Sequence, residues 1–567
     1  MKRPELAARP GNATASELRS PLLGAAVLLN VAVDVRLWLG RPYLAAPAWL
    51  LSLGMIAFAI PRNRAARDPR PPFPRWTLAM IALPAVVRVL FFDLDRIHGD
   101  DLLTAFFSSS YQLRRDFFAP VPDEAWQWVA QFPAPFFFFQ KLFFLVFGES
   151  LLIVKLSVLP YVIVLAAFLY AIARELLDEA GGFLAVVAYA FFGPSLYLET
   201  LGLHFVSSTT TFLALLYVAM REHQTGDPRL ALASGMLTGA CYLFYLSSFL
   251  ALPIGAAFIV AGIAAPRLRS ATTNLRFYVL GTALVLGPFV VDGLSHGNYF
   301  LRRFDQVALL GGEWSPYKDA LRSTARAREV VVENARLCFR ALWQPGLGGH
   351  GGYDFGHQAL LAPIVGALVV LGALRALMLG RRRREWWALL AIVVLSFVTG
   401  MVLTIPPPAF HRASLAFPLL ALFSALPLHA CWTARLESVV LRRIAPAVVV
   451  LAVAFEGIVY LERSALTESP ASPLRLARFV NERFPGRPLY VAAFPSYAFE
   501  KVYHFTPNRH ATKVVTDYHN NLLAKLDPTR PYVYVITLPN DFDGQFAARD
   551  PHGRIIRFTE EYSVFVN

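Results

Sequence analysis

Residues 151–173 read LLIVKLSVLPYVIVLAAFLYAIA, a continuous apolar run whose one charged side chain is Lys155. A helix needs about 20 mostly apolar residues to cross the ~30 Å hydrocarbon core of a bilayer. Only helices and closed barrels satisfy the backbone hydrogen bonds there. The run ends at Arg174, and basic residues at span ends mark the cytoplasmic side. This stretch therefore predicts a transmembrane helix whose arginine end faces the cytoplasm.

The composition of the whole chain agrees with a membrane protein. Of its 567 residues, 56% are hydrophobic and 16% are charged, fewer charges than globular domains carry. The net charge is +14, yet Lys and Arg occur in short clusters between apolar runs. Such clusters suit contact with anionic lipid head groups and not the continuous stripe that binds nucleic acid. We expect membrane lipids as partners and no nucleic acid.

Further apolar runs flank this helix on both sides. Two of them, near 22–40 and 42–60, form a predicted hairpin that ends at the basic cluster Arg62 to Arg70. The others lie near 76–92, 182–198, 205–220, 230–246, 248–265, 277–292, 358–379, 386–404, 413–430 and 442–460. The total is about thirteen spans, and every basic cluster between spans then falls on one side. The pattern predicts a multi-pass plasma (inner) membrane protein with a cytoplasmic N-terminus.

The predicted spans divide the chain into three parts. Residues 1–75 hold an N-terminal tail and the extra hairpin. Residues 76–462 form the transmembrane domain, with outer loops at 93–150 and 292–357. Residues 463–567 have the composition of a small soluble domain. We expect an all-α polytopic membrane protein with a small extracytoplasmic α/β domain at its C-terminus.

Three segments of residues 463–567 carry secondary-structure signals. Short apolar stretches at 488–494 and 531–538 predict strands, and 473–484 predicts an amphipathic helix. None of these segments contains an acid–base constellation of its own. We therefore expect this domain to serve as a lid or as a docking element for the acceptor.

The first outer loop carries two adjacent acids, Asp100 and Asp101, directly after the third span. A carboxylate at a membrane boundary can act as a general base toward a hydroxyl or an amine. Its neighbour can hold a divalent cation, Mg²⁺ or Mn²⁺, so Asp101 is a candidate metal ligand. The simpler interpretation is that acids at a span end are only solvated.

The aromatic stretch 136–147 in the same loop is too short to span the bilayer comfortably. It predicts a helix at the membrane surface, where a lipid substrate could enter from the side. An aromatic belt without a ligand would have the same composition.

The second outer segment is rich in cations, against the positive-inside bias. It includes Arg302 and Arg303, and His411 and Arg412 lie at the outer mouth of a late span. Arginine can hold a lipid phosphate by paired hydrogen bonds and stabilise charge on a leaving group. An amphipathic surface helix over 317–343 would also account for the cations of that region. A glycine-rich stretch predicts a mobile loop that carries His350, Tyr353, Asp354 and His357.

The outer features occur in a characteristic order. An acidic pair follows an early span, and surface helices and two prolines before aromatics come next. The motifs Phe147-Gly148-Glu149-Ser150 and Val154-Lys155-Leu156-Ser157 follow. This order resembles the GT-C superfamily of membrane glycosyltransferases, especially bacterial members similar to protein O-mannosyltransferases and lipid A aminoarabinose transferases. The resemblance covers roughly residues 76 to 300.

The resemblance implies a function and assigns roles. It implies transfer of a sugar, with inversion, from a polyprenyl-phosphate-linked donor to an extracytoplasmic lipid, glycan or protein acceptor. Asp100 would be the catalytic base and Asp101 its partner. The donor phosphate would be held by cations of the outer side, namely Lys141, Arg302, Arg303, His411 and Arg412.

The chain departs from the family pattern at two places. Family members commonly have Asp-Glu at the acidic pair and His-Pro-Pro later, where this chain has Asp100-Asp101 and Phe132-Pro133-Ala134-Pro135. The base could therefore be Asp123 or Glu124 instead. A divergent branch with its own acceptor, or a loss of activity, would also explain these departures.

Two further functions compete with a transferase. A transporter or lipid flippase needs ionisable groups near the bilayer midplane, and the predicted spans contain few, Arg88 and Glu456 among them. A noncatalytic GT-C-like scaffold would keep the bundle without the active site. Isolated histidines such as His204 and His429 are expected to be structural.

Overall fold

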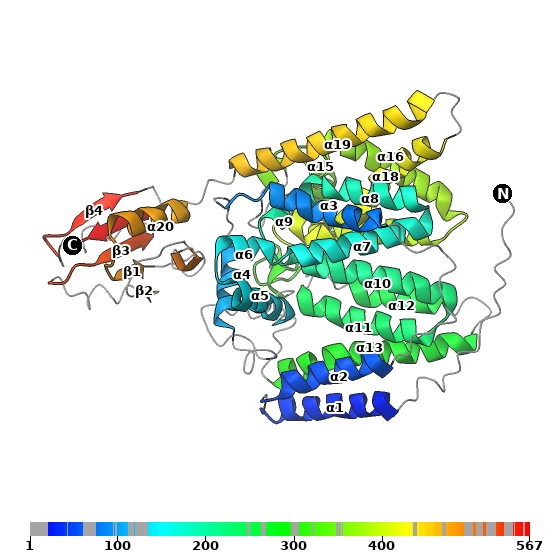
Figure 1. Ribbon diagram of the computed structural model, residues 1–567, viewed down its shortest axis with the longest axis horizontal. Helices are drawn as coiled ribbons and strands as arrows, with labels where there is room; N and C mark the ends of the chain where they lie inside the picture. Colours follow the sequence, from blue (N-terminus) through cyan, green and yellow to red (C-terminus); the bar gives the residue numbers. More distant parts are fainter. Residues whose placement is uncertain are drawn as a thin grey trace.

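The computed structural model describes residues 21–41, 43–59, 75–94, 96, 99–111, 118, 134–245, 250–261, 268–295, 305–319, 323–347, 353, 355–434, 439–467, 472–492, 503–505, 514–517, 529–537, 548, 550–558 and 562–567. In these ranges the chain forms a helical bundle, with a small mixed sheet beyond one end (Figure 1).

The helices follow the predicted apolar runs, because a helix is the local way to pair backbone groups in lipid. Their bounds in the first half are α1 (Pro21–Trp38), α2 (Ala45–Ala59), α3 (Trp76–Leu90), α4 (Gly99–Ser110), α5 (Ala134–Phe147), α6 (Leu151–Leu156), α7 (Leu159–Leu176), α8 (Glu179–Ala190), α9 (Gly193–Thr200), α10 (Phe205–Thr225), α11 (Pro228–Phe244) and α12 (Ala251–Ala261). Those in the second half are α13 (Leu268–Ser295), α15 (Thr324–Ala341), α16 (Pro363–Gly380), α17 (Glu385–Phe397), α18 (Phe417–Thr433), α19 (Val439–Thr467) and α20 (Ser472–Arg483).

Within the described ranges, seven helices are long and apolar enough to cross a membrane. An eighth is added if α8 and α9, bent by 57° at the break between them, form one span. Shorter apolar helices are α2, α3 and most of α5. The chain is thus a multi-pass membrane protein, and the count of thirteen spans stays a prediction.

Helices α11 and α13 cross at small residues. A Cβ on Gly235 would lie 2.0 Å from the Tyr278 carbonyl oxygen, and one on Gly281 would lie 2.2 Å from the Leu232 carbonyl oxygen. Glycine allows the two backbones to approach this closely, as is common between membrane helices. Neither position accepts a side chain without separating the helices.

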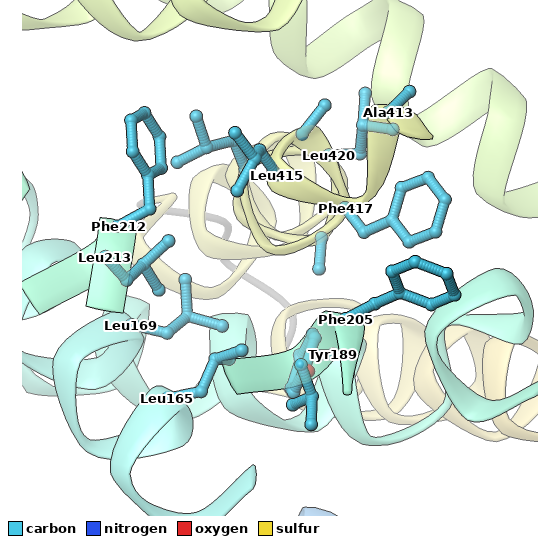
Figure 2. Close-up of a cluster of buried hydrophobic side chains, with 14 of the residues drawn as sticks. Leu165, Leu169, Tyr189, Phe205, Phe212, Leu213, Ala413, Leu415, Phe417 and Leu420 are labelled. Atoms are coloured by element: carbon cyan, nitrogen blue, oxygen red, sulfur yellow. The ribbon is translucent and has the colours of Figure 1, made fainter. Parts of the chain in front are cut away.

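The centre of the bundle is α18 with the 3₁₀ turn η8 (Phe410–Ala416) that precedes it. Leu415, Phe417 and Leu420 of this segment lie among side chains of α7 and α10 (Figure 2). Nearly every side chain of η8 and of the first turns of α18 is buried. A helix that is apolar on all sides belongs in the interior of a bundle. The polar residues on η8, His411 and Arg412, therefore sit inside the protein.

The predicted cytoplasmic arginines meet at one end of the bundle. Arg383 Nη1 donates to the Glu175 carbonyl oxygen at 2.8 Å, and Arg221 Nη1 lies 3.3 Å from Glu175 Oε2. At the opposite end of α7 lie α4, α5 and α6, on the side of the C-terminal sheet (Figure 1). Basic loops and candidate acids thus occupy opposite ends. Which end faces the cytoplasm stays a prediction.

The sheet consists of β1 (Leu489–Ala492), β2 (Val514–Asp517), β3 (Val533–Thr537), β4 (Arg554–Arg557) and β5 (Tyr562–Val566). Its order is β2-β1-β3-β5-β4, with β1 parallel to β2 and β3 and with β5 antiparallel to β3 and β4. The strands β1 and β3 and the helix α20 lie where the sequence predicts them. The domain boundaries at residues 75 and 462 stay predictions.

Candidate functional site

The predicted acids begin α4. Asp101 is 1% exposed, and its Oδ1 accepts a hydrogen bond from the Leu102 amide at 2.5 Å. The backbone of Asp100 lies in the first turn of α4, but its side chain lies outside the described part of the structure. Asp123 and Glu124 also lie outside it. The burial of Asp101 argues against a merely solvated acid at this position.

Two buried cations close to the start of α4 were missing from the predicted site. Lys155 is 1% exposed, and its Nζ donates to the carbonyl oxygens of Arg96 at 2.8 Å and Thr200 at 2.9 Å. Arg96 is also buried, and its Nη1 donates to Thr200 Oγ1 at 3.3 Å. Its guanidinium stacks 4.6 Å from the centre of the Tyr197 ring.

These contacts offset part of the cost of burying the two charges. Two buried cationic side chains thus donate to oxygens of the same residue, Thr200. A lone lysine inside an apolar span is by default a functional candidate, and that signal was present in the sequence.

A buried ion pair fixes the helix that carries Thr200. Arg88 Nε lies 2.7 Å from Glu199 Oε2, and Arg88 Nη1 donates to the Ala190 carbonyl oxygen at 2.6 Å. Tyr189 donates its hydroxyl hydrogen to the other Glu199 oxygen. The pair thus joins α3 to both halves of the bent segment α8–α9. Because Glu199 precedes Thr200, the pair also positions Thr200, whose carbonyl oxygen accepts from Lys155 and whose hydroxyl oxygen accepts from Arg96.

Histidines and aromatic rings form a packed layer beside these cations. The ring centres of Tyr353 and His411 are 4.5 Å apart, so the structure brings two predicted site residues together. Phe205 lies 5.3 Å from His411 and 5.4 Å from Tyr353. His204, predicted to be structural, lies 5.3 Å from Tyr245 and belongs to the same layer. Aromatic linings with a few polar groups are typical of small-molecule sites.

The predicted mobile loop needs a correction at Tyr353. Tyr353 is 1% exposed and Phe355 is fully buried, because both pack against rings of neighbouring helices. Tyr353 is therefore part of the aromatic layer and not of a mobile loop. His357 is exposed, and its carbonyl oxygen accepts from the Gly346 amide at 2.6 Å. His350 and Asp354 lie outside the described residues.

Two of the predicted phosphate-binding cations have protein partners. Arg412 is 8% exposed, and its Nη1 donates to the Ile405 carbonyl oxygen at 2.6 Å. Lys141 Nζ donates to the Ser109 carbonyl oxygen. Arg302 and Arg303 lie outside the described residues. A phosphate role for Lys141, His411 and Arg412 stays a prediction.

The described part of the chain contains no group of three His, Cys, Asp or Glu side chains close enough to hold a metal ion. That part includes the side chain of Asp101 but not those of Asp100, Asp123 or Glu124. Divalent-cation binding at the acidic pair therefore stays a prediction.

A polar cluster joins α4 and the turn between α5 and α6 to the C-terminal segment. His504 Nε2 lies 2.8 Å from Glu149 Oε2 and 3.2 Å from Ser109 Oγ, and Ser109 Oγ donates to Glu149 Oε1 at 2.7 Å. Partial burial opposes ionisation of Glu149, but hydrogen bonds from Ser109 and His504 lower its pKa below the usual value. The cluster thus links α4 and the turn between α5 and α6 to His504.

Fold and site together define a multi-pass membrane protein with a buried acid at the start of α4, the buried cations Arg96 and Lys155, and an aromatic layer around His411. Residues 132–291 match the family model described as dolichyl-phosphate-mannose-protein mannosyltransferase. This segment is less than half of the chain, and it contains Lys141, Lys155, Thr200 and His204. No curated protein matches the sequence.

Solved structures similar to this chain are membrane glycosyltransferases. ArnT from Cupriavidus metallidurans bound to undecaprenyl phosphate is 12% identical, with a TM-score of 0.54 over 87% of this chain and 98% of that chain. The same protein in the apo state is 13% identical, with a TM-score of 0.53 over 87% and 97%. The apo oligosaccharyltransferase of Archaeoglobus fulgidus is 13% identical, with a TM-score of 0.49 over 84% and 71%. The likeness to ArnT shows that this chain has the fold of the GT-C membrane glycosyltransferases.

Proposed function

We propose that this protein transfers a sugar from a polyprenyl-phosphate-linked donor to an extracytoplasmic acceptor, with inversion at the anomeric carbon. The observation that carries the proposal is the fold shared with ArnT, a protein whose structure binds undecaprenyl phosphate. The buried cations Arg96 and Lys155, at the end of the bundle where α4 begins, support it further. Cationic side chains are the groups that attract an anionic lipid head group.

The proposed reaction is a single displacement. Asp100 takes the proton of the acceptor hydroxyl or amine, and the freed electron pair attacks the anomeric carbon. The bond between that carbon and the phosphate oxygen breaks, and polyprenyl phosphate leaves with the bonding electrons. Asp101 orients Asp100 or holds a divalent cation. Charge on the leaving phosphate is balanced by cations in its reach, the candidates being Lys141, Arg302, Arg303, His411 and Arg412.

The contacts of Arg88 argue against a transporter. A carrier uses intramembrane charges that exchange partners during transport. The Arg88 guanidinium is fully buried and bonded to Glu199 and to backbone carbonyls of α3 and α8. That arrangement suits a fixed structural pair. Whether the protein is a noncatalytic scaffold is decided by experiment.

The test is lipid binding followed by transfer. Purified protein in lipid nanodiscs is expected to retain undecaprenyl phosphate in native mass spectrometry and not undecaprenol, which lacks the phosphate. Lys141→Gln and Arg412→Gln should each weaken retention roughly tenfold, because a charge-assisted hydrogen bond is lost. Arg326→Gln is the matched control, since Arg326 is exposed and pairs with Glu329 on α15.

Equal retention of both lipids would overturn the proposed donor class. Retention of undecaprenyl phosphate without glycosyl transfer from any polyprenyl-phosphate sugar would favour the scaffold. Movement of the intact lipid across reconstituted vesicles without transfer would favour the flippase.

A further inference from the structure

A proline in α13 leaves one backbone carbonyl without its helical partner. Pro288 lies inside α13 and has no N–H, so the carbonyl oxygen of Leu284, four residues earlier, loses its intrahelical donor. An unpaired carbonyl in a membrane helix is unfavourable, because no water is there to replace the lost donor. The Leu284 oxygen instead accepts from Asn30 Nδ2 at 2.9 Å and from Trp49 Nε1 at 3.0 Å.

Both donors come from the N-terminal hairpin formed by α1 and α2, which lies against α13 at the edge of the bundle (Figure 1). Asn30 Nδ2 also donates to Ser52 Oγ at 3.1 Å, and Ser52 Oγ donates to the Trp49 carbonyl oxygen at 2.7 Å. Asn30, Trp49 and Ser52 are all buried. These three side chains thus have a physical reason to lie in an apolar hairpin, because they fix the hairpin at the Leu284 carbonyl oxygen of α13.

The ring of Trp49 makes a second connection. Its centre lies 5.6 Å from the Phe289 ring and 5.9 Å from the Phe118 ring, and Phe118 and Phe289 are 4.8 Å apart. Phe118 is 4% exposed and belongs to the first outer loop, between Asp101 and Asp123 in the sequence. The two contacts of Trp49 are edge-on, and aromatic contacts of this kind stabilise beyond the burial of area alone.

We propose that Trp49 is a positioning residue, which holds the first outer loop against α13 through Phe118. The extra hairpin thereby sets the place of the loop that carries the candidate acids. The catalytic consequence rests on the proposed function, whereas the contact itself does not. The two roles of Trp49 are separable, because its N–H donates to the Leu284 carbonyl oxygen and its ring contacts Phe118.

The experiment follows tryptic cleavage of the purified full-length protein after Arg114 or Arg115, the basic residues that precede Phe118. Trp49→Leu removes both roles and should raise the cleavage rate roughly tenfold. Trp49→Phe keeps a ring and leaves Asn30 on the Leu284 oxygen, so its rate should stay near that of the wild type. Trp38→Leu, at an exposed position on α1, is the control.

Phe118→Leu should raise the cleavage rate as Trp49→Leu does. The double variant should show no further increase, because both substitutions remove the same contact between the rings of Trp49 and Phe118. Unchanged cleavage in Trp49→Leu would overturn the proposal. An equal rise in Trp49→Leu, Trp49→Phe and Asn30→Leu would also overturn it, since loss of the carbonyl donors would then be the cause.

A transfer assay gives the functional readout. Trp49→Leu is expected to lower kcat while donor KM and undecaprenyl phosphate binding stay unchanged, and Trp49→Phe should restore kcat. A rise in donor KM with unchanged kcat would contradict a role through the acid-bearing loop. If the wild type fails to bind undecaprenyl phosphate but the cleavage pattern holds, the proposed function fails and the loop-holding role of Trp49 stands.

Discussion

His504 Nε2 lies 2.8 Å from Glu149 Oε2, so a residue of the C-terminal domain is bound to the turn between α5 and α6. Aromatic contacts reinforce this link. The ring centres of Phe106 in α4 and His504 are 5.6 Å apart, and those of Phe144 in α5 and Phe505 are 5.9 Å apart. Because α4 also begins with the candidate acids, docking of the C-terminal domain and placement of those acids involve one helix. This contact supports the predicted role of the domain as a lid or acceptor-docking element.

Glu149→Gln is expected to loosen the docking of the C-terminal domain, because the amide loses the charge that faces His504 and Lys141. The pKa of Glu149 is lowered in the folded protein, so its contribution is present above the ordinary glutamate pKa of about 4.3. It is lost as the pH falls through the lower, folded value. The midpoint of thermal unfolding of the wild type and of the variant, followed from pH 7 to pH 3, measures this effect.

The wild type and Glu149→Gln should therefore differ at pH 7 and converge in acid. Glu329→Gln is the control, because its partner Arg326 is exposed and such pairs contribute little. A difference that stayed constant across the whole pH range would show that the carboxylate charge is not responsible.

Gly235→Ala is expected to destabilise the bundle by about 1–3 kcal/mol or more, because the new methyl group meets the Tyr278 carbonyl oxygen of α13. Gly54→Ala in α2 meets no atom within 4 Å, and alanine is the better helix former, so stability should stay equal or rise slightly. Thermal unfolding of both variants in detergent, read by size-exclusion chromatography, tests the contrast. Equal melting temperatures would mean that α11 and α13 do not cross at this distance.

Arg88→Met is expected to reduce the folded fraction sharply, because it leaves the Glu199 carboxylate buried without its cation. Breaking one side of a buried ion pair typically costs about 3–5 kcal/mol. The double variant Arg88→Met with Glu199→Gln should recover part of the loss, since no uncompensated charge remains. Arg326→Met on the exposed face of α15 is the comparison, and the yield of monodisperse protein is the measurement. A double variant less stable than Arg88→Met would contradict this account.

The helices were predictable because apolar runs of sufficient length leave a membrane-embedded chain few other structures. The bend between α8 and α9 was not predicted, because the run 182–198 is apolar throughout and hydropathy alone does not report a change of direction. Gly193 and Pro194, where α9 begins, are its local signal. The gathering of basic loops at one end of the bundle was also predictable, since Arg174 and its counterparts mark span ends without any tertiary knowledge.

The site was predictable in part. The sequence singled out Asp101, Tyr353 and His411, whose environments are buried. It did not connect Lys155 to the carbonyl oxygens of Arg96 and Thr200, because that contact depends on how three separate segments pack. The same holds for Glu149 and His504, which are distant in sequence. Chemistry-bearing residue types are visible in a sequence, whereas their partners follow from the fold.

Asp100→Asn is expected to lower turnover by about 10² or more while undecaprenyl phosphate binding stays unchanged, because asparagine keeps the shape of the side chain but removes the base. Asp101→Asn should lower turnover less than Asp100→Asn does if Asp101 orients its neighbour, since the asparagine oxygen can still accept from the Leu102 amide. Turnover and lipid binding of the same preparations are the measurements, so that a folding defect and a chemical defect can be told apart.

The later acids of the loop decide between two assignments of the base. Asp123→Asn and Glu124→Gln are expected to retain turnover if Asp100 is the base, because neither residue then takes the acceptor proton. Full turnover in Asp100→Asn, together with its loss in Asp123→Asn or Glu124→Gln, would move the base to the later position. If all four acidic substitutions, Asp101→Asn included, were silent in a working transfer assay, the first outer loop would hold no base. Proton removal would then have to come from another residue, and His411 and Tyr353 of the aromatic layer would be the next to substitute.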